Sequence, residues 1–221
     1  MAVDHNSYAD RIVAFIDCLG FEQKVIDSAN DPKLIAPLRM MNFHFQAGQF
    51  AGNQNVDFQT LQFSDTLVIS TSASADGLWY LVLWARAKAF NVLHLGMLLR
   101  GAVAVGPMIH EGSMAFGPAY LEAYHLESRV ALHPRIILSR RAAELAQDAA
   151  NNPDSWQAEY LRKYLRRDND GIVYIEIFDN PATDMMFAGL LANVDTRQGY
   201  IDLLKNLVGK VENEISRVRT H

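Results

Sequence analysis

The stretch RIVAFIDCLGFEQKV, residues 11–25, places an acidic residue where a buried strand gives way to a helix. Its first apolar residues predict a strand at 11–16 in the interior of a sheet. Asp17 follows at once, and Gly20 then precedes a helical pattern over 21–29. Because a carboxylate at the end of an inner strand is costly to desolvate unless it is paired, Asp17 either caps the next helix or binds a metal ion.

The composition is that of an ordinary globular protein. Half of the 221 residues are hydrophobic and 20% are charged, which predicts one domain over 1–221. The elements and motifs described below place its core at about 11–140 and C-terminal additions at 141–221. The net charge of −5 argues against a nucleic-acid partner, which needs a basic face. The single cysteine, Cys18, excludes an intrachain disulfide and a thiolate zinc cluster, and it fits a reducing cytoplasm.

Nothing in the sequence predicts insertion into a membrane. The first residues, MAVDHNSYADR, contain no apolar signal-peptide core. The longest strongly apolar stretch, 78–84, is too short to span a bilayer. We therefore expect a soluble cytoplasmic protein.

The order of predicted elements indicates an α+β fold. The predicted strands are 11–16, 56–63, 66–71, 98–106, 135–139 and 172–178. The predicted helices are 21–29, 32–50, 75–96, 118–132, 140–150, 156–167 and 197–218. The first 140 residues thus follow a ferredoxin-like order, an antiparallel sheet with helices mostly on one face.

This fold would bring two carboxylates together. Asp17 ends the first strand, and Asp65 lies in the two-residue turn of a hairpin that flanks that strand. Two neighbouring carboxylates fit Mg²⁺ or Mn²⁺, whose remaining ligands are phosphate oxygens and water. Gly20 and the start of the following helix would offer backbone N–H groups to a phosphate chain. The alternative is ordinary structural chemistry, with Asp17 as a helix cap and Asp65 as a turn residue.

Four motifs carry a resemblance to a known family: FIDCLGF (15–21), FSDTLVIS (63–70), LRGAVAVG (99–106) and FGPAYLEAYHLE (116–127). In this order the chain resembles the catalytic domain of class III nucleotide cyclases, and most of all the stand-alone pyrimidine cyclases of bacterial Pycsar anti-phage systems. The resemblance implies a homodimer with composite active sites and two Mn²⁺ or Mg²⁺ ions per site. The metal-binding residues would be Asp17, Ile16 and Asp65. The residues in contact with the substrate would include Cys18, Leu19, Gly20 and Phe21.

The chain departs from the family on the helix predicted at 118–132. Where cyclases carry an Asn for the ribose and an Arg for the transition state, this chain has Leu121 and His125. His125 can donate a hydrogen bond or carry a charge, and Arg129 lies one turn further along the same face. Arg100 and Arg135 are further candidates for a phosphate-binding cation, and the sequence does not choose among them.

The positions that read a purine base also differ. They hold Leu61 and Met114, which cannot reproduce polar contacts to adenine. The expected reaction is therefore UTP to 3′,5′-cyclic UMP and pyrophosphate, or CTP to cyclic CMP. The product would act on a separate effector during phage defence, as the resemblance implies. The alternatives are a purine nucleotide cyclase and a catalytically silent dimer that binds nucleotide.

Overall fold

The computed structural model describes residues 7–46 and 56–177, and all structural statements below concern these residues. Four strands form the centre of the sheet in the order β2-β3-β1-β4, with every neighbouring pair antiparallel. They are β1 (Ala9–Leu19), β2 (Gln59–Phe63), β3 (Thr66–Ser72) and β4 (Leu98–Glu111). With helices between β1 and β2 and between β3 and β4, this is the ferredoxin-like arrangement. The predicted α+β fold is therefore confirmed.

Further strands extend the sheet beyond β4. β6 (Ile136–Leu138) pairs with β4 in parallel, and β8 (Val173–Ile175) and β7 (Leu165–Arg167) follow it. β5 (Met114–Phe116) forms a hairpin with the end of β4. β5 was not expected from the sequence, because three residues are too few to show an alternating pattern. The residues of β7 were predicted as the end of the helix at 156–167, which is wrong: that helix ends at Tyr164, and residues 165–167 pair with β8. Residues 141–177 thus join the same sheet as the predicted core.

The helices largely match their predicted positions. They are α1 (Phe21–Ser28), α2 (Ile35–Gln46), α3 (Ala75–Leu93), α4 (Pro118–Arg129), α5 (Arg140–Ala150) and α6 (Trp156–Tyr164), with a 3₁₀ turn at Pro32–Leu34. Side chains of Ser74, Ser139 and Ser155 accept backbone N–H groups at the starts of α3, α5 and α6, and this fixes where those helices begin. The end of the helix predicted at 32–50 and the helix predicted at 197–218 fall outside the described residues.

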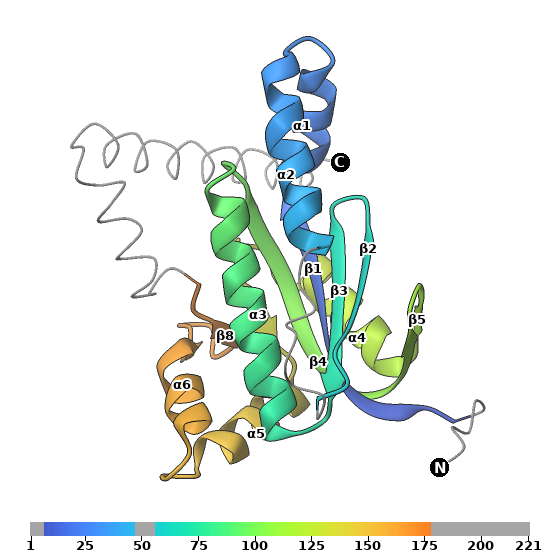
Figure 1. Cartoon of the computed structure of the whole chain (residues 1–221). Helices are drawn as coiled ribbons and strands as arrows, with labels where there is room; N and C mark the ends of the chain where they lie inside the picture. Colours follow the sequence, from blue (N-terminus) through green and yellow to red (C-terminus); the bar gives the residue numbers. More distant parts are fainter. Residues whose placement is uncertain (1–6, 47–55, 178–221) are drawn as a thin grey trace, which may run out of the picture.

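The two faces of the sheet are covered differently. One face packs against α2, α3 and α5, and its core includes Met41, Trp84 and Ala142. α3 is buried around much of its circumference, as its apolar sequence predicts. The opposite face, with Val13, Phe15 and Val68, packs against Ala119 and Ala123 of α4. Figure 1 shows α3 lying along the sheet and the α1–α2 hairpin projecting beyond its end.

The first strand is longer than predicted, and this moves Asp17. The sequence placed the strand at 11–16 with Asp17 at its end, but β1 continues to Leu19. The strand continues because residues 17–19 remain paired with residues 98–100 of β4. The chain turns only at Gly20, where φ is +78°, a conformation that favours glycine. Asp17 therefore lies inside a strand with neighbours on both sides.

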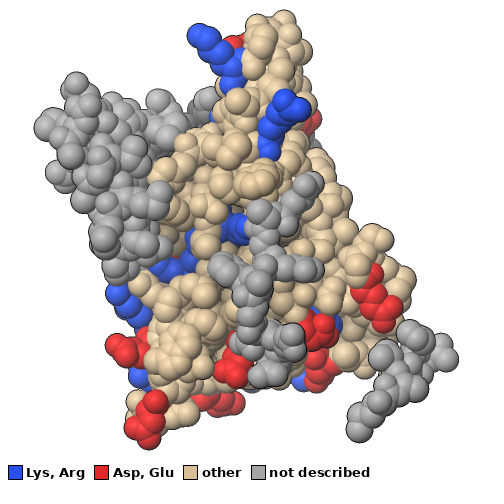
Figure 2. All heavy atoms as spheres, viewed as in Figure 1, with Lys and Arg blue, Asp and Glu red and all other residues tan. Residues whose placement is uncertain are grey.

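Two further features concern charge on the surface and the length of the helices. On the face shown in Figure 2, the Lys and Arg side chains of the described residues are scattered and do not form a continuous basic stripe. None of the helices that the structure describes is long and apolar enough to cross a membrane.

Candidate active site

Asp17 and Asp65 lie together at the edge of the β1–β3 pair. Asp17 is paired in register with Thr66, and Asp65 directly precedes Thr66 in the two-residue turn between β2 and β3. Ser64, the other residue of this turn, has a φ of 54°. Both aspartates are partly buried. The hairpin therefore places the second carboxylate beside the first, on the neighbouring strand.

The charge around Asp17 is unbalanced. The pKa of Asp17 is raised to about 6: burial and the carboxylates of Asp65 and Glu127 raise it, and Arg100 and the backbone N–H of Cys18 oppose the rise. Three carboxylates thus gather around one guanidinium group. Such a cluster disfavours its own charged form unless a cation neutralises it.

Arg100 reaches this cluster from β4. Its register partner on β1 is Asp17, so the two side chains project side by side from the same face of the sheet. The distance from Nη2 of Arg100 to Oδ2 of Asp17 is 3.5 Å. Arg100 binds more closely to Glu127, with Nε and Nη2 at 2.7 Å and 2.6 Å from the same Oε1.

Glu127 is the site residue that sequence reasoning missed. It lies on α4, and its side chain is 5% exposed. Together with Ala119 and Ala123 it forms the buried face of that helix. A signal was present in the sequence, because a spacing of four residues puts all three on one helical face. A glutamate on such a face needs a buried partner, and Arg100 is that partner.

The turn after Asp17 offers backbone groups rather than side chains. Cys18 is buried, with its Sγ 3.6 Å from the Sδ of Met97, and burial raises the pKa of its thiol strongly. Leu19 is half-buried in the strand, and Phe21 packs against the core. Gly20 has no side chain to cap α1. Only the N–H groups at the start of α1 can therefore serve an anion here.

The residues fit a divalent cation held by few protein ligands. Within residues 7–46 and 56–177, no group of three or more His, Cys, Asp or Glu side chains is arranged to hold a metal ion. A site made of Asp17 and Asp65 would supply two carboxylates, a set that suits Mg²⁺ or Mn²⁺ when phosphate and water complete the shell. Ile16, predicted as a further ligand, lies between Leu67 and Gly101 in the sheet.

The predicted residues of α4 lie on its outer face. Leu121 is 54% exposed, and His125 and Arg129 are exposed along the same side of the helix. This side is roughly opposite the buried face that carries Glu127. Within one chain, the structure therefore does not bring these three residues to the two aspartates.

The predicted base-binding residues are both apolar, and they differ in burial. Leu61 on β2 packs against the core cluster that includes Phe15 and Val68. Met114 on β5 is 46% exposed. The ring of Phe15 makes edge contacts with Phe63, Tyr120 and Tyr124. The sheet face next to Asp17 is therefore aromatic and apolar.

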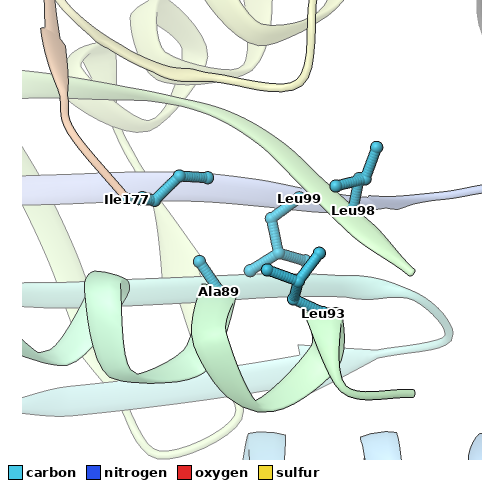
Figure 3. A pocket seen from close by; sticks show the side chains of 5 residues that line it. All are labelled: Ala89, Leu93, Leu98, Leu99 and Ile177. Carbon is cyan, nitrogen blue, oxygen red and sulfur yellow. The ribbon is translucent and has the colours of Figure 1, made fainter. Parts of the chain in front are cut away.

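Two other features are structural. Nη1 and Nη2 of Arg135, a candidate phosphate-binding cation in the sequence, each lie 2.6 Å from a carboxylate oxygen, of Asp168 and Asp170 respectively. This pairing ties the segment before β8 to the core. Figure 3 shows an apolar hollow elsewhere, lined by Ala89, Leu93, Leu98, Leu99 and Ile177. It offers no polar side chain to a substrate.

Comparison with known protein families finds no match, and no curated protein matches the chain. Among solved structures, the guanylyl cyclase domain of the RhoGC fusion protein from the aquatic fungus Blastocladiella emersonii has a TM-score of 0.45 and 16% identity over 76% of this chain and 94% of that chain. The guanylyl cyclase Cya2 has a TM-score of 0.45 and 12% identity over 76% and 93%. The guanylate cyclase domain of RhGC from Catenaria anguillulae, in complex with GTP, has a TM-score of 0.42 and 17% identity over 64% and 84%. The neighbours of this α+β chain thus include guanylyl cyclase domains.

Proposed function

We propose that the chain is a pyrimidine nucleotide cyclase that converts UTP to 3′,5′-cyclic UMP and pyrophosphate, with CTP as the nearest alternative substrate. The observation that carries the proposal is the pair of Asp17, on β1, and Asp65, in the turn between β2 and β3, with Arg100 beside Asp17 on β4. Asp17 lies four residues before the start of α1, which has no side-chain cap on its first N–H groups. Carboxylates and N–H groups together suit a triphosphate with its divalent cations.

In this reaction the ribose 3′-oxygen forms a bond to the α-phosphorus. The bond from that phosphorus to the bridging oxygen of the β-phosphate breaks, pyrophosphate leaves with the bonding electrons, and the 3′-hydroxyl proton passes to water. Divalent cations, when bound by Asp17 and Asp65, would lower the pKa of the 3′-hydroxyl and neutralise phosphate charge. The chain itself supplies alignment: the carboxylates fix the cations, and the start of α1 orients phosphate oxygens.

The exposed side of α4 supports a homodimer with shared sites. Because His125 and Arg129 lie away from Asp17 in one chain, they can act only at the site of a second copy. Leu121 and Tyr124 on the same helix, Phe63 at the end of β2, and Met114 and Phe116 on β5 are large apolar side chains that are all at least 43% exposed. An exposed apolar surface of this kind is typical of an interface. Each subunit would thus contribute its aspartates to one site and its α4 side chains to the other.

The choice of a pyrimidine rests on the apolar residues at the base-reading positions. Leu61 and Met114 present no donor or acceptor that would favour a purine edge. The guanylyl cyclase domains among the structural neighbours make a purine cyclase the second candidate. By resemblance, the cyclic product would activate a separate effector in anti-phage defence. The chain itself would bind neither nucleic acid nor membrane.

The test is to incubate the purified chain with each of the four ribonucleoside triphosphates and Mn²⁺ or Mg²⁺, and to identify products by mass spectrometry. Cyclic UMP or cyclic CMP is expected, and Asp65→Asn should lower the rate on the order of 1,000-fold, because the cations contribute several kcal/mol. Asp57→Asn, at a partly exposed aspartate elsewhere, is the matched control and should retain activity. A cyclic purine product would overturn the specificity. Nucleotide binding without any product would support the silent dimer instead.

A second experiment tests the shared sites. Asp65→Asn and the double variant His125→Ala/Arg129→Ala should each be inactive alone. Mixed and allowed to exchange subunits, they should regain part of the activity, because one of the two composite sites in a mixed dimer is then intact. Mixtures that stay inactive, while size-exclusion chromatography shows that the subunits exchange, would contradict the composite arrangement.

A further inference from the structure

The guanidinium group of Arg100 lies between two carboxylates and is closer to one of them. Its Nη2 lies 2.6 Å from Oε1 of Glu127 and 3.5 Å from Oδ2 of Asp17. Nε of Arg100 donates a hydrogen bond of 2.7 Å to the same Oε1. The contact with Glu127 is therefore a close ion pair that contains a short hydrogen bond, whereas the contact with Asp17 is at the limit of hydrogen bonding.

The environments of the two carboxylates explain this preference. The side chain of Glu127 is 5% exposed and that of Asp17 is 24% exposed. A buried carboxylate without a partner is far more costly than one that water can reach. Arg100 therefore satisfies Glu127 first and leaves Asp17 with incomplete compensation.

Arg100 and a divalent cation are competitors for Asp17, because both neutralise the same carboxylate. If the charge on Glu127 were removed, the nearest remaining anion for Arg100 would be Asp17. A cation that binds to Asp17 would then have to displace the guanidinium group. The pair on β4 and α4 thus controls how available Asp17 is.

We propose that Glu127 is a positioning residue that sets the divalent-cation affinity of Asp17 and Asp65 by holding Arg100 away from Asp17. This inference deepens the proposed function and rests on it for the identity of the cation site. Glu127 itself touches neither the cation nor the substrate. Its effect on the cation therefore passes through Arg100.

The test is Mn²⁺ binding, measured by electron paramagnetic resonance of the free ion in titrations without nucleotide. Four proteins are compared: the wild type, Glu127→Gln, Arg100→Gln and the double variant. Glu127→Gln should weaken Mn²⁺ binding roughly tenfold, because Arg100 then competes with the cation for Asp17. A tenfold change in Kd corresponds to about 1.4 kcal/mol. Arg100→Gln should tighten it, and the double variant should bind within about twofold of Arg100→Gln, because Glu127 has nothing left to position.

Comparing the two single variants with the double variant separates an effect through Arg100 from a direct effect of the Glu127 charge on the cation. If Glu127 acted through space on the cation, Glu127→Gln would weaken binding equally with or without Arg100, and that result would overturn the inference. Unchanged or weaker binding in Arg100→Gln would overturn it too. If either single variant does not fold, the double variant still decides, because replacing both partners leaves no unpaired buried charge. It should bind Mn²⁺ more tightly than the wild type, and equal or weaker binding would overturn the inference.

The outcomes also distinguish the inference from the proposed function. Mn²⁺ binding that follows the predicted cycle, with no turnover of any triphosphate, would leave the inference in place and overturn the cyclase. Turnover of a triphosphate, combined with effects of Glu127→Gln and Arg100→Gln on Mn²⁺ binding that simply add in the double variant, would support the cyclase and overturn the inference. Mn²⁺ binding that Asp65→Asn leaves unchanged would overturn both.

Discussion

Two polar clusters lie six residues apart on the same face of β1, and they solve the problem of buried charge in opposite ways. At one end, Arg11 donates to the carboxylate and the backbone oxygen of Asp57 and, at 2.9 Å, to Oγ of Ser70. Ser70 in turn contacts Nδ1 of His110 at 2.8 Å. At the other end, Asp17 shares Arg100 with Glu127 and has Asp65 as a neighbour.

The difference lies in the charge balance. The Arg11 cluster has one cation, one anion and a histidine whose pKa is lowered to about 4 by burial and by Arg11, so it is neutral as a whole near pH 7. The Asp17 cluster has three carboxylates and one guanidinium. A balanced cluster is satisfied by its own members, whereas an excess of negative charge is relieved by a proton or by a cation from outside. This contrast is the reason for placing the proposed site at the Asp17 end.

The comparison of the two clusters can be tested by their effects on stability. The largest effect is expected from the response of the Arg11 cluster to acid. Because the pKa of His110 is about 4 in the folded chain and about 6.5 when unfolded, the unfolded state binds more protons between these values. The contribution of His110 is therefore present above about pH 6.5 and is lost as the pH falls towards 4, by about 3 kcal/mol in all. Urea unfolding across this range should show a shallower loss for His110→Gln than for the wild type. An equal change produced by His133→Gln, at an exposed position, would refute the assignment.

The next effect is the loss of the buried cation. Arg11→Met should lower the free energy of unfolding by about 2 kcal/mol, since it removes the hydrogen bonds that Arg11 donates to Ser70 and Asp57 while water can still reach Asp57. The matched control is Arg141→Met, whose partner Asp10 is half exposed like Arg141 itself. That control should change stability by about 0.5 kcal/mol or less. Equal losses of unfolding free energy in Arg11→Met and Arg141→Met would mean that the burial of Arg11 and its hydrogen bonds adds nothing to stability.

The smallest effect is a difference in sign. The pKa of Asp17 is raised from 3.8 to about 6 in the folded chain. Its contribution to folding stability is therefore fully present at a pH below 3.8, the pKa in the unfolded chain, and is lost as the pH rises through about 6. Asp17→Asn should therefore stabilise the metal-free chain at pH 8 by about 1 kcal/mol. Burial alone would raise the pKa of Asp57, but hydrogen bonds from Arg11 and Gln59 lower it overall, so Asp57→Asn should destabilise. Urea unfolding in EDTA measures both, and the same sign in both variants would break the comparison.

Much of the fold could be predicted because its signals are local. Alternating residues on either side of a two-residue turn predicted the hairpin that carries Asp65, and the observed turn is at residues 64–65. The boundaries of α5, Arg140–Ala150, match the prediction, because Ser139 caps its start. The end of β1 was wrong because strand pairing with β4, a non-local contact, keeps residues 17–19 extended.

The site was only partly predictable for the same reason. Asp17 and Asp65 stand out in sequence because each interrupts an apolar run. Arg100 was noted as a possible phosphate-binding residue, but its pairing with Glu127 depends on α4 packing over β4, a contact between residues 27 positions apart. No periodicity in either segment shows which side chains meet across the two elements.

The most direct test of the central claim is the response of stability to Mn²⁺, measured by urea unfolding of the wild type, Asp65→Asn and Asp57→Asn with Mn²⁺ or with EDTA. A cation that binds only the folded chain stabilises it by about 2.7 kcal/mol at 100 times its Kd. The account predicts that the wild type and Asp57→Asn gain stability alike and that Asp65→Asn gains little. An equal gain in Asp65→Asn would show that the unbalanced cluster is not where the cation binds, and would contradict the account.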